Sequence, residues 1–168
     1  ITINSEKMSK SLNNFFLAKD VLESYSGDAL RYFLLSVHYR NPLDYSKDRL
    51  DEAEKNMERL TEVIRRIKEL KEKQGDEKTE ESRVLSEAAE TALRVFHEAM
   101  DDDFNTGLAT GAMFDLAKAI NIYGSAVDGG LATDEEAVTK AYDALKTITD
   151  VLGILETAWK KQTVADDT

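Results

Sequence analysis

The spacing of hydrophobic positions along this 168-residue chain predicts a protein built almost entirely from helices. Through four long segments, apolar side chains recur every three or four residues, which is the period of one helix face. These segments cover residues 47–74, 79–100, 106–126 and 134–152. Short connections make neighbouring helices antiparallel, so the pattern predicts an up-and-down bundle.

Two shorter helices are expected before the bundle. The first runs from Phe15 to Tyr25 and ends at Ser26-Gly27, because glycine readily adopts the left-handed conformation found at helix ends. Asp28 is expected to cap the second, which continues to about His38. This second helix is apolar on almost every side, which predicts that it is buried centrally.

The predicted fold class is therefore all-α, an antiparallel helical bundle preceded by a short strand and loop and by two linker helices. We assign residues 1–14 to the strand and loop, 15–45 to the linker helices and 46–161 to the bundle. The polar residues 162–168 are expected to form a disordered tail, and the polar connection at 74–78 is expected to be mobile.

Composition narrows the class of protein. Hydrophobic residues make up 42% and charged residues 33%, as in soluble globular proteins, and no apolar run approaches the roughly 18–20 residues that span a bilayer. The absence of cysteine leaves no disulfide framework and no thiolate metal site. Without a signal-peptide pattern, we expect a cytoplasmic protein with no membrane partner. Because the chain begins at Ile1, within a predicted strand, we expect it to be part of a longer protein.

The net charge of −11 is unevenly distributed along the chain. Residues 1–73 contain 14 basic and 13 acidic residues, whereas residues 74–168 contain 8 and 20. An acidic surface disfavours a nucleic-acid partner, so any RNA contact is expected before residue 74. The most basic cluster, within residues 65–73, is interleaved with glutamates, so a solvated face is about as good an interpretation as a phosphate contact.

The residues best suited to chemistry lie in the polar loop Lys7-Met8-Ser9-Lys10-Ser11. Two lysines on flexible stems can neutralise charge that develops on phosphate oxygens, and serine hydroxyls can add hydrogen-bond donors. By residue type alone, an ordinary surface loop is the better interpretation.

No metal site is predicted from the remaining candidates. His38 and His97 lie on separate predicted helices without a shared ligand spacing. The three acids at 101–103 are adjacent, whereas loop-type calcium sites need alternating ligands. We interpret these acids as a helix end and a cap for the next helix.

The longer pattern around the loop resembles a known family. Lys7 to Ser11 matches the KMSKS signature of class I aminoacyl-tRNA synthetases. The segments beyond it resemble cysteinyl-tRNA synthetase, and the resemblance extends to about Leu155. These segments are Leu12-Asn13-Asn14-Phe15-Phe16, Gly27-Asp28-Ala29-Leu30-Arg31-Tyr32-Phe33-Leu34-Leu35-Ser36, His38-Tyr39-Arg40-Asn41-Pro42-Leu43 and Met100-Asp101-Asp102-Asp103-Phe104-Asn105-Thr106.

The resemblance implies an enzyme that activates cysteine with ATP and ligates it to tRNA(Cys). Residues 1–14 would end its catalytic domain, and Lys7 to Ser11 would form a mobile loop that closes on ATP. Lys7 and Lys10 would be catalytic, with Lys10 contacting the phosphates. The segment from Asp28 to Arg31 would link the catalytic domain to a tRNA-binding bundle of the DALR type.

Some of the family's features are missing from this sequence. The HIGH motif and the cysteine, histidine and glutamate ligands of the substrate-binding zinc are absent, so zinc is expected in the whole enzyme only. This chain alone is expected to be inactive and monomeric. Asn13 stands where the family has glycine, and asparagine tolerates the left-handed backbone. Gly107 stands where the family has proline, which should weaken the start of that helix.

Two other hypotheses remain open. The chain could be a non-catalytic helical adaptor that binds protein, or part of a paralogous ligase that attaches cysteine to an amino sugar. A HIGH motif and thiol-site ligands encoded upstream would exclude the adaptor.

Overall fold

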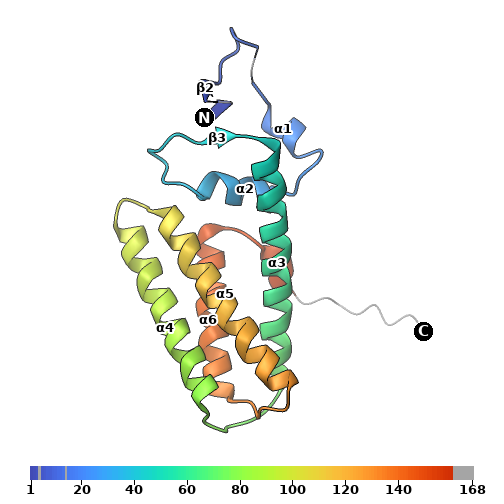
Figure 1. Cartoon of the computed structure of the whole chain (residues 1–168), viewed down its shortest axis with the longest axis vertical. Helices are drawn as coiled ribbons and strands as arrows, with labels where there is room; N and C mark the ends of the chain where they lie inside the picture. The colour runs from blue at the N-terminus through green and yellow to red at the C-terminus, as the bar shows by residue number, and fades with distance from the viewer. Residues whose placement is uncertain (4, 14, 161–168) are drawn as a thin grey trace, which may run out of the picture.

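Four long helices form a bundle, and a small sheet lies beyond one of its ends (Figure 1). The computed structural model describes residues 1–160 except 4 and 14, so the predicted tail at 162–168 lies outside the described residues. The bundle helices agree with the predicted segments to within a few residues, and the all-α fold class is confirmed. They are α3 (Lys47–Glu72), α4 (Glu80–Asp101), α5 (Thr106–Asp128) and α6 (Glu135–Leu152).

The four helices do not pack in a square in which each helix lies beside the next one in the sequence. Consecutive helices run in opposite directions, as predicted (Figure 1). However, α4 packs mainly against α5 and α6, and α3 packs against the same two helices from the other side. Two consecutive helices, α3 and α4, therefore occupy diagonal corners of the bundle.

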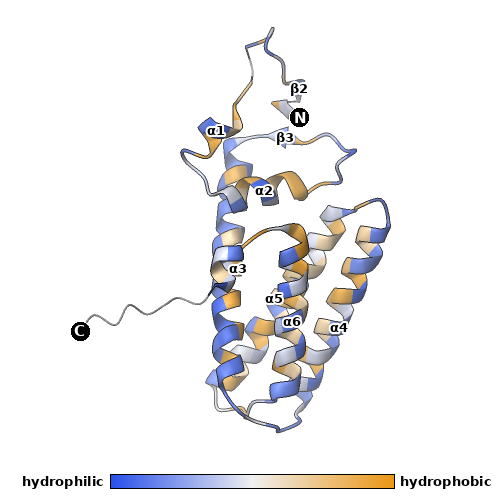
Figure 2. Ribbon diagram, turned by 180° about the vertical axis from the view of Figure 1, so that it is seen from behind, coloured by the Kyte–Doolittle hydropathy of each residue, from blue (hydrophilic) through white to orange (hydrophobic). Residues whose placement is uncertain are grey.

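The predicted apolar stripes line the core between the helices. Figure 2 shows α3 with a largely hydrophilic outer surface, interrupted by hydrophobic positions. Leu108, within the predicted segment 106–126, is 51% exposed, because Ala109 and Met113 occupy the inward face at the start of α5. The largest fully buried side chains are Leu50, Leu60, Ile64, Ile67, Leu85, Phe96, Met113, Leu116, Ile120, Tyr123, Leu145 and Ile148.

The connection between α3 and α4 is paired with the connection between α5 and α6. Glu77 N donates to the Thr133 carbonyl at 3.3 Å, and Glu135 N donates to the Gly75 carbonyl at 2.8 Å. The connection at 74–78, expected to be mobile, is thus held by backbone hydrogen bonds to a segment far away in the sequence. Its polar composition does not reveal this pairing.

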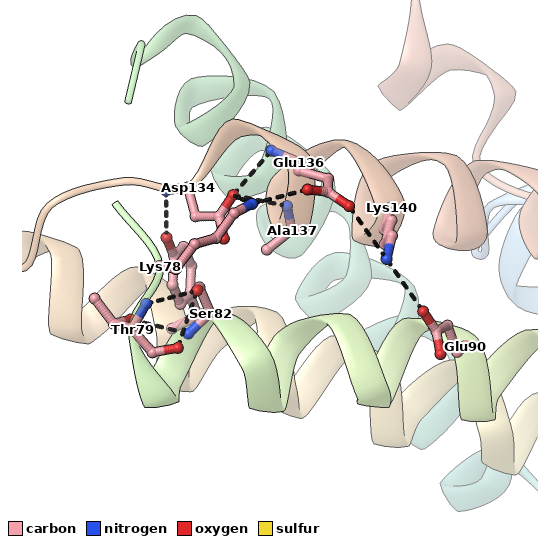
Figure 3. Close-up of polar contacts among 9 residues, drawn as sticks. Lys78, Thr79, Ser82, Glu90, Asp134, Glu136, Ala137 and Lys140 are labelled. Carbon is pink, nitrogen blue, oxygen red and sulfur yellow. Dashed lines mark hydrogen bonds and ion pairs between the residues drawn. The ribbon is translucent and has the colours of Figure 1, made fainter. Parts of the chain in front are cut away.

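Side chains reinforce this end of the bundle (Figure 3). Lys78 Nζ lies 2.9 Å from Asp134 Oδ1 and 2.8 Å from Glu136 Oε2. Asp134 is the N-cap of α6. A capping box lies at the start of α4, where Thr79 and Ser82 exchange side-chain to backbone hydrogen bonds.

The N-terminal part contains three two-residue strands in the order β2-β1-β3. β1 (Thr2–Ile3) pairs antiparallel with β2 (Glu6–Lys7) and parallel with β3 (Asp44–Tyr45). The predicted strand at the N-terminus is therefore confirmed, but its partner β3 was not anticipated.

The three short helices are α1 (Ala18–Val21), α2 (Gly27–Leu35) and α7 (Glu156–Trp159). α1 is much shorter than predicted at both ends, and Phe16, before its start, stacks on Tyr45 with ring centroids 4.7 Å apart. α2 was expected to be buried centrally. Instead it lies across one end of the bundle (Figure 1), with Leu34 exposed.

Tyr123 provides a test of how the end of α5 is joined to the start of α6. Its ring is 1% exposed, and its hydroxyl accepts a hydrogen bond from Asp134 N at 3.0 Å. Tyr123→Phe leaves this buried N–H without its acceptor, so we expect a loss of about 1–3 kcal/mol in the free energy of unfolding. Urea denaturation measures it. Tyr142→Phe, at a half-buried ring, is the control, and equal stability of both variants would contradict the assignment.

Candidate functional site at the N-terminal sheet

The sequence-predicted phosphate-binding residues begin in β2 of the sheet. Lys7 is the second residue of β2, paired with Thr2 of β1, and its side chain is exposed. Met8 N donates to the Ile1 carbonyl at 3.2 Å, which extends the pairing beyond the strand. Lys7 therefore lies on a strand, whereas the sequence suggested a loop throughout.

Beyond β2 the chain forms a turn. The Ser9 hydroxyl accepts a hydrogen bond from Leu12 N at 3.2 Å and lies 3.1 Å from the Ser11 hydroxyl. Asn13 N donates to the Lys10 carbonyl at 3.2 Å. Asn13 has a φ of 51°, the left-handed conformation expected for the asparagine at this position. The turn brings the two serines together and leaves Lys10 exposed.

Asp44 anchors this sheet, and sequence reasoning missed it. Its Oδ1 accepts hydrogen bonds from the Thr2 hydroxyl at 2.7 Å and from Ser5 N at 3.0 Å. The Thr2 hydroxyl and then the Ser5 amide hold the pKa of the Asp44 carboxyl below its usual value. The only local indication was that buried Leu43 follows a proline and lies two residues before an aromatic residue, a pattern too short to define a strand.

Aromatic contacts connect the sheet to α2. Tyr45 of β3 stacks on Phe16 and meets Phe33 of α2 edge-on, with ring centroids 6.2 Å apart. Phe33 is 4% exposed and belongs to the hydrophobic core. Through Tyr45, both β3 and the segment that follows the Ser9–Asn13 turn are therefore connected to α2.

Asp28 and Arg31 of α2 hold the turn between α6 and α7. Asp28 Oδ1 accepts a hydrogen bond from Leu155 N at 3.0 Å, and Arg31 Nε donates to the Leu152 carbonyl at 2.6 Å. The prediction that Asp28 caps α2 is wrong, because the Ser26 hydroxyl is the cap and accepts from Ala29 N. We call these two hydrogen bonds of Asp28 and Arg31 the α2 clamp.

A second contact joins two of the motif segments. The Tyr39 hydroxyl donates to Asp103 Oδ1 at 2.9 Å, and Arg40 Nε lies 3.0 Å from Asp103 Oδ2. The acids at 101–103 do end α4, but the cap of α5 is Asn105, whose side chain accepts from Leu108 N. The segments around Tyr39 and Asp103, distant in sequence, therefore meet in space.

Within residues 1–160, apart from positions 4 and 14, no group of three or more His, Cys, Asp or Glu residues is placed to hold a metal ion. In the same part of the chain, no helix is long and apolar enough to cross a membrane.

Two family models match the chain on either side of the α2 clamp. The model of the tRNA synthetases class I (C) catalytic domain matches residues 1–55, which include the sheet, α1 and α2. The model of the DALR domain matches residues 95–156, which include α5, α6 and the turn held by α2.

Proteins named cysteine–tRNA ligase are similar to almost the whole chain. The protein of Geobacter metallireducens is 46% identical over 92% of this chain and 32% of its own length. The protein of Desulfitobacterium hafniense is 43% identical over 91% of this chain and 32% of its own length. The protein of Thermococcus onnurineus is 36% identical over 99% of this chain and 35% of its own length. The chain belongs to the cysteinyl-tRNA synthetase family. It spans about a third of the length of the curated relatives it matches.

Family membership gives the α2 clamp a structural meaning. Asp28 and Arg31 lie in the segment matched by the catalytic-domain model, and Leu152 and Leu155 lie in the segment matched by the DALR model. The clamp therefore joins the two matched segments through side-chain to backbone hydrogen bonds. The division at residues 14 and 45 stays a prediction.

The Asp44 anchor predicts how the sheet responds to pH. Because the folded pKa is lower than the unfolded value of about 3.9, the stabilisation is present above that value and is lost as the pH falls through the folded pKa. We expect the Ser5 amide resonance to titrate with a midpoint below 3.9 in NMR spectra. Asp44→Ala should abolish this titration, while Asp48→Ala should not. A midpoint at or above 3.9 would argue against the anchor.

Proposed function

We propose that this chain is the part of a cysteinyl-tRNA synthetase that carries the KMSKS lysines and the helical bundle that docks on tRNA. The whole enzyme activates cysteine with ATP and ligates it to tRNA(Cys) in the cytoplasm. The observation that carries the proposal is the position of two exposed lysines, Lys7 on β2 and Lys10 on the turn that follows, beside a sheet that α2 joins to the DALR segment.

The proposed chemistry assigns a role to each lysine. During activation, a carboxylate oxygen of cysteine bonds to the α-phosphorus of ATP, and the bond from that phosphorus to the leaving pyrophosphate breaks. Negative charge therefore grows on the departing phosphates, where an ammonium group stabilises it. Lys10, exposed on the turn, makes this contact, while Lys7, on paired strand β2, assists.

The remaining parts of the reaction belong to the whole enzyme. The HIGH motif and the ligands of the substrate-binding zinc are not in this sequence, so we propose that this chain alone, as a monomer, does not catalyse ATP–pyrophosphate exchange. The relatives named cysteine–tRNA ligase support a synthetase over the adaptor and over the amino-sugar ligase.

Substitution of Lys10 in the full-length enzyme tests the proposal. An interaction that strengthens in the transition state raises the rate of the chemical step rather than ground-state affinity. Lys10→Ala should therefore lower kcat of cysteine-dependent ATP–pyrophosphate exchange by roughly 10²–10³-fold and change KM for ATP much less. Steady-state exchange kinetics measure both constants.

Two controls sharpen that experiment. Lys19→Ala removes an exposed lysine of α1 and should leave both constants unchanged, and this 168-residue chain alone should show no exchange. An unchanged kcat with a raised KM in Lys10→Ala would refute the transition-state role. Cysteine-dependent exchange by this chain alone would refute the proposed division of the site.

A further inference from the structure

A groove of about 530 Å³ lies between α3 and α5, away from the N-terminal sheet. Leu60, Val63 and Ala117 are buried residues that contribute to its lining. Arg59 of α3 and Lys118 of α5 contribute one cation from each helix. Figure 1 shows these two helices converging toward their C-terminal ends.

The charge of this groove differs from that of the rest of the bundle. No lining residue is acidic, although the chain carries a net charge of −11. Arg59 and Lys118 are exposed, and among the described residues neither has a carboxylate within 4.0 Å, whereas Arg65 and Arg66 of α3 are both ion-paired. A concave surface with two such cations favours a polyanion.

The groove also contains groups that suit the sugar part of a nucleic acid. Asn56 and Asn121 add amides that can hydrogen-bond hydroxyl and phosphate oxygens. Ile122, 58% exposed, adds an apolar surface that fits ribose carbons better than it fits a solvated acidic peptide.

One wall of the groove is fixed by α2. The Tyr32 ring meets Phe114 of α5 edge-on, with centroids 5.8 Å apart, and Tyr32 and Asn56 line one cavity between α2 and α3. Because Phe114 lines the groove, Tyr32 supports the side of the groove formed by α5. A surface that is already ordered loses less conformational entropy when it binds.

The basic cluster at 65–73, the earlier candidate for RNA contact, is less suitable. Arg65 is paired with Glu62 and Glu69. Lys68 Nζ donates to the Ala158 carbonyl at 3.2 Å, and Lys71 Nζ lies 4.0 Å from the centroid of the Tyr142 ring. These cations already have partners within the fold.

We propose that the groove between α3 and α5 binds the sugar–phosphate backbone of an RNA stem, with Arg59 and Lys118 contacting phosphates. The inference rests on the proposed function and names the surface of the bundle that contacts tRNA. Arginine and lysine both bind phosphate through charge-assisted hydrogen bonds. The amides and the apolar residues then favour RNA over a simple anion.

The test measures tRNA(Cys) binding to the full-length synthetase over a range of salt concentrations. Arg59→Ala and Lys118→Ala should each weaken binding roughly tenfold and make the slope of log K against log salt shallower by about 1. The double variant should make it shallower by about 2. Arg65→Ala removes an equal charge from the same helix at an ion-paired position, and should change affinity and slope much less.

ATP–pyrophosphate exchange without tRNA separates this inference from the proposed function. All three single variants should keep wild-type exchange and wild-type thermal unfolding, because Arg59, Lys118 and Arg65 are exposed. Unchanged tRNA affinity in Arg59→Ala and Lys118→Ala would overturn the proposal that the groove binds RNA. Equal losses of tRNA affinity in Arg59→Ala and Arg65→Ala would also overturn it. So would competition by poly-glutamate as effective as that by RNA. If the wild-type enzyme lacks cysteine-dependent exchange, the proposed function fails, while the comparison of variants still decides whether the groove binds RNA.

Discussion

The arrangement of this chain depends on two hydrogen bonds from α2 to the turn between α6 and α7. Asp28 and Arg31 bind backbone groups of Leu155 and Leu152, which lie 127 and 121 residues away in the sequence. Hydrogen bonds to charged groups contribute about 1.5–3 kcal/mol each. Because α2 also packs along α3 and contacts β3 through Phe33, the clamp joins the end of the bundle to the sheet.

The same helix organises both surfaces to which we assign a function. Through Phe33 and Tyr45 it supports the sheet that leads into the turn with the exposed Lys10, and through Tyr32 it contacts Phe114, which lines the groove between α3 and α5. A synthetase must hold ATP and the acceptor end of tRNA together, since orientation supplies much of the catalytic advantage. A rigid α2 would fix the lysines that we propose contact ATP relative to the groove that we propose binds RNA.

Local patterns predicted the parts of the structure that local interactions determine. The four long helices follow from hydrophobic periodicity, and Asn13 adopts the left-handed backbone that its side chain tolerates. Several of the failures involve partners distant in sequence. Phe16 leaves its predicted helix for Tyr45, Asp28 binds Leu155 instead of capping α2, and the connection at 74–78 pairs with the one before α6. The motif located Lys7 and Lys10, but neither the anchor at Asp44 nor the groove could be predicted, because each combines residues from separate elements.

The distance between the sheet and the bundle tests the role of the α2 clamp most directly. The chain contains no cysteine, so spin labels can be attached at Glu6→Cys in β2 and Thr147→Cys in α6, both exposed positions. Double electron–electron resonance should give one narrow distance distribution in the otherwise wild-type chain and a broad one when Asp28→Ala and Arg31→Ala are added. A broad distribution with the clamp intact, or an unchanged narrow one without it, would contradict the account.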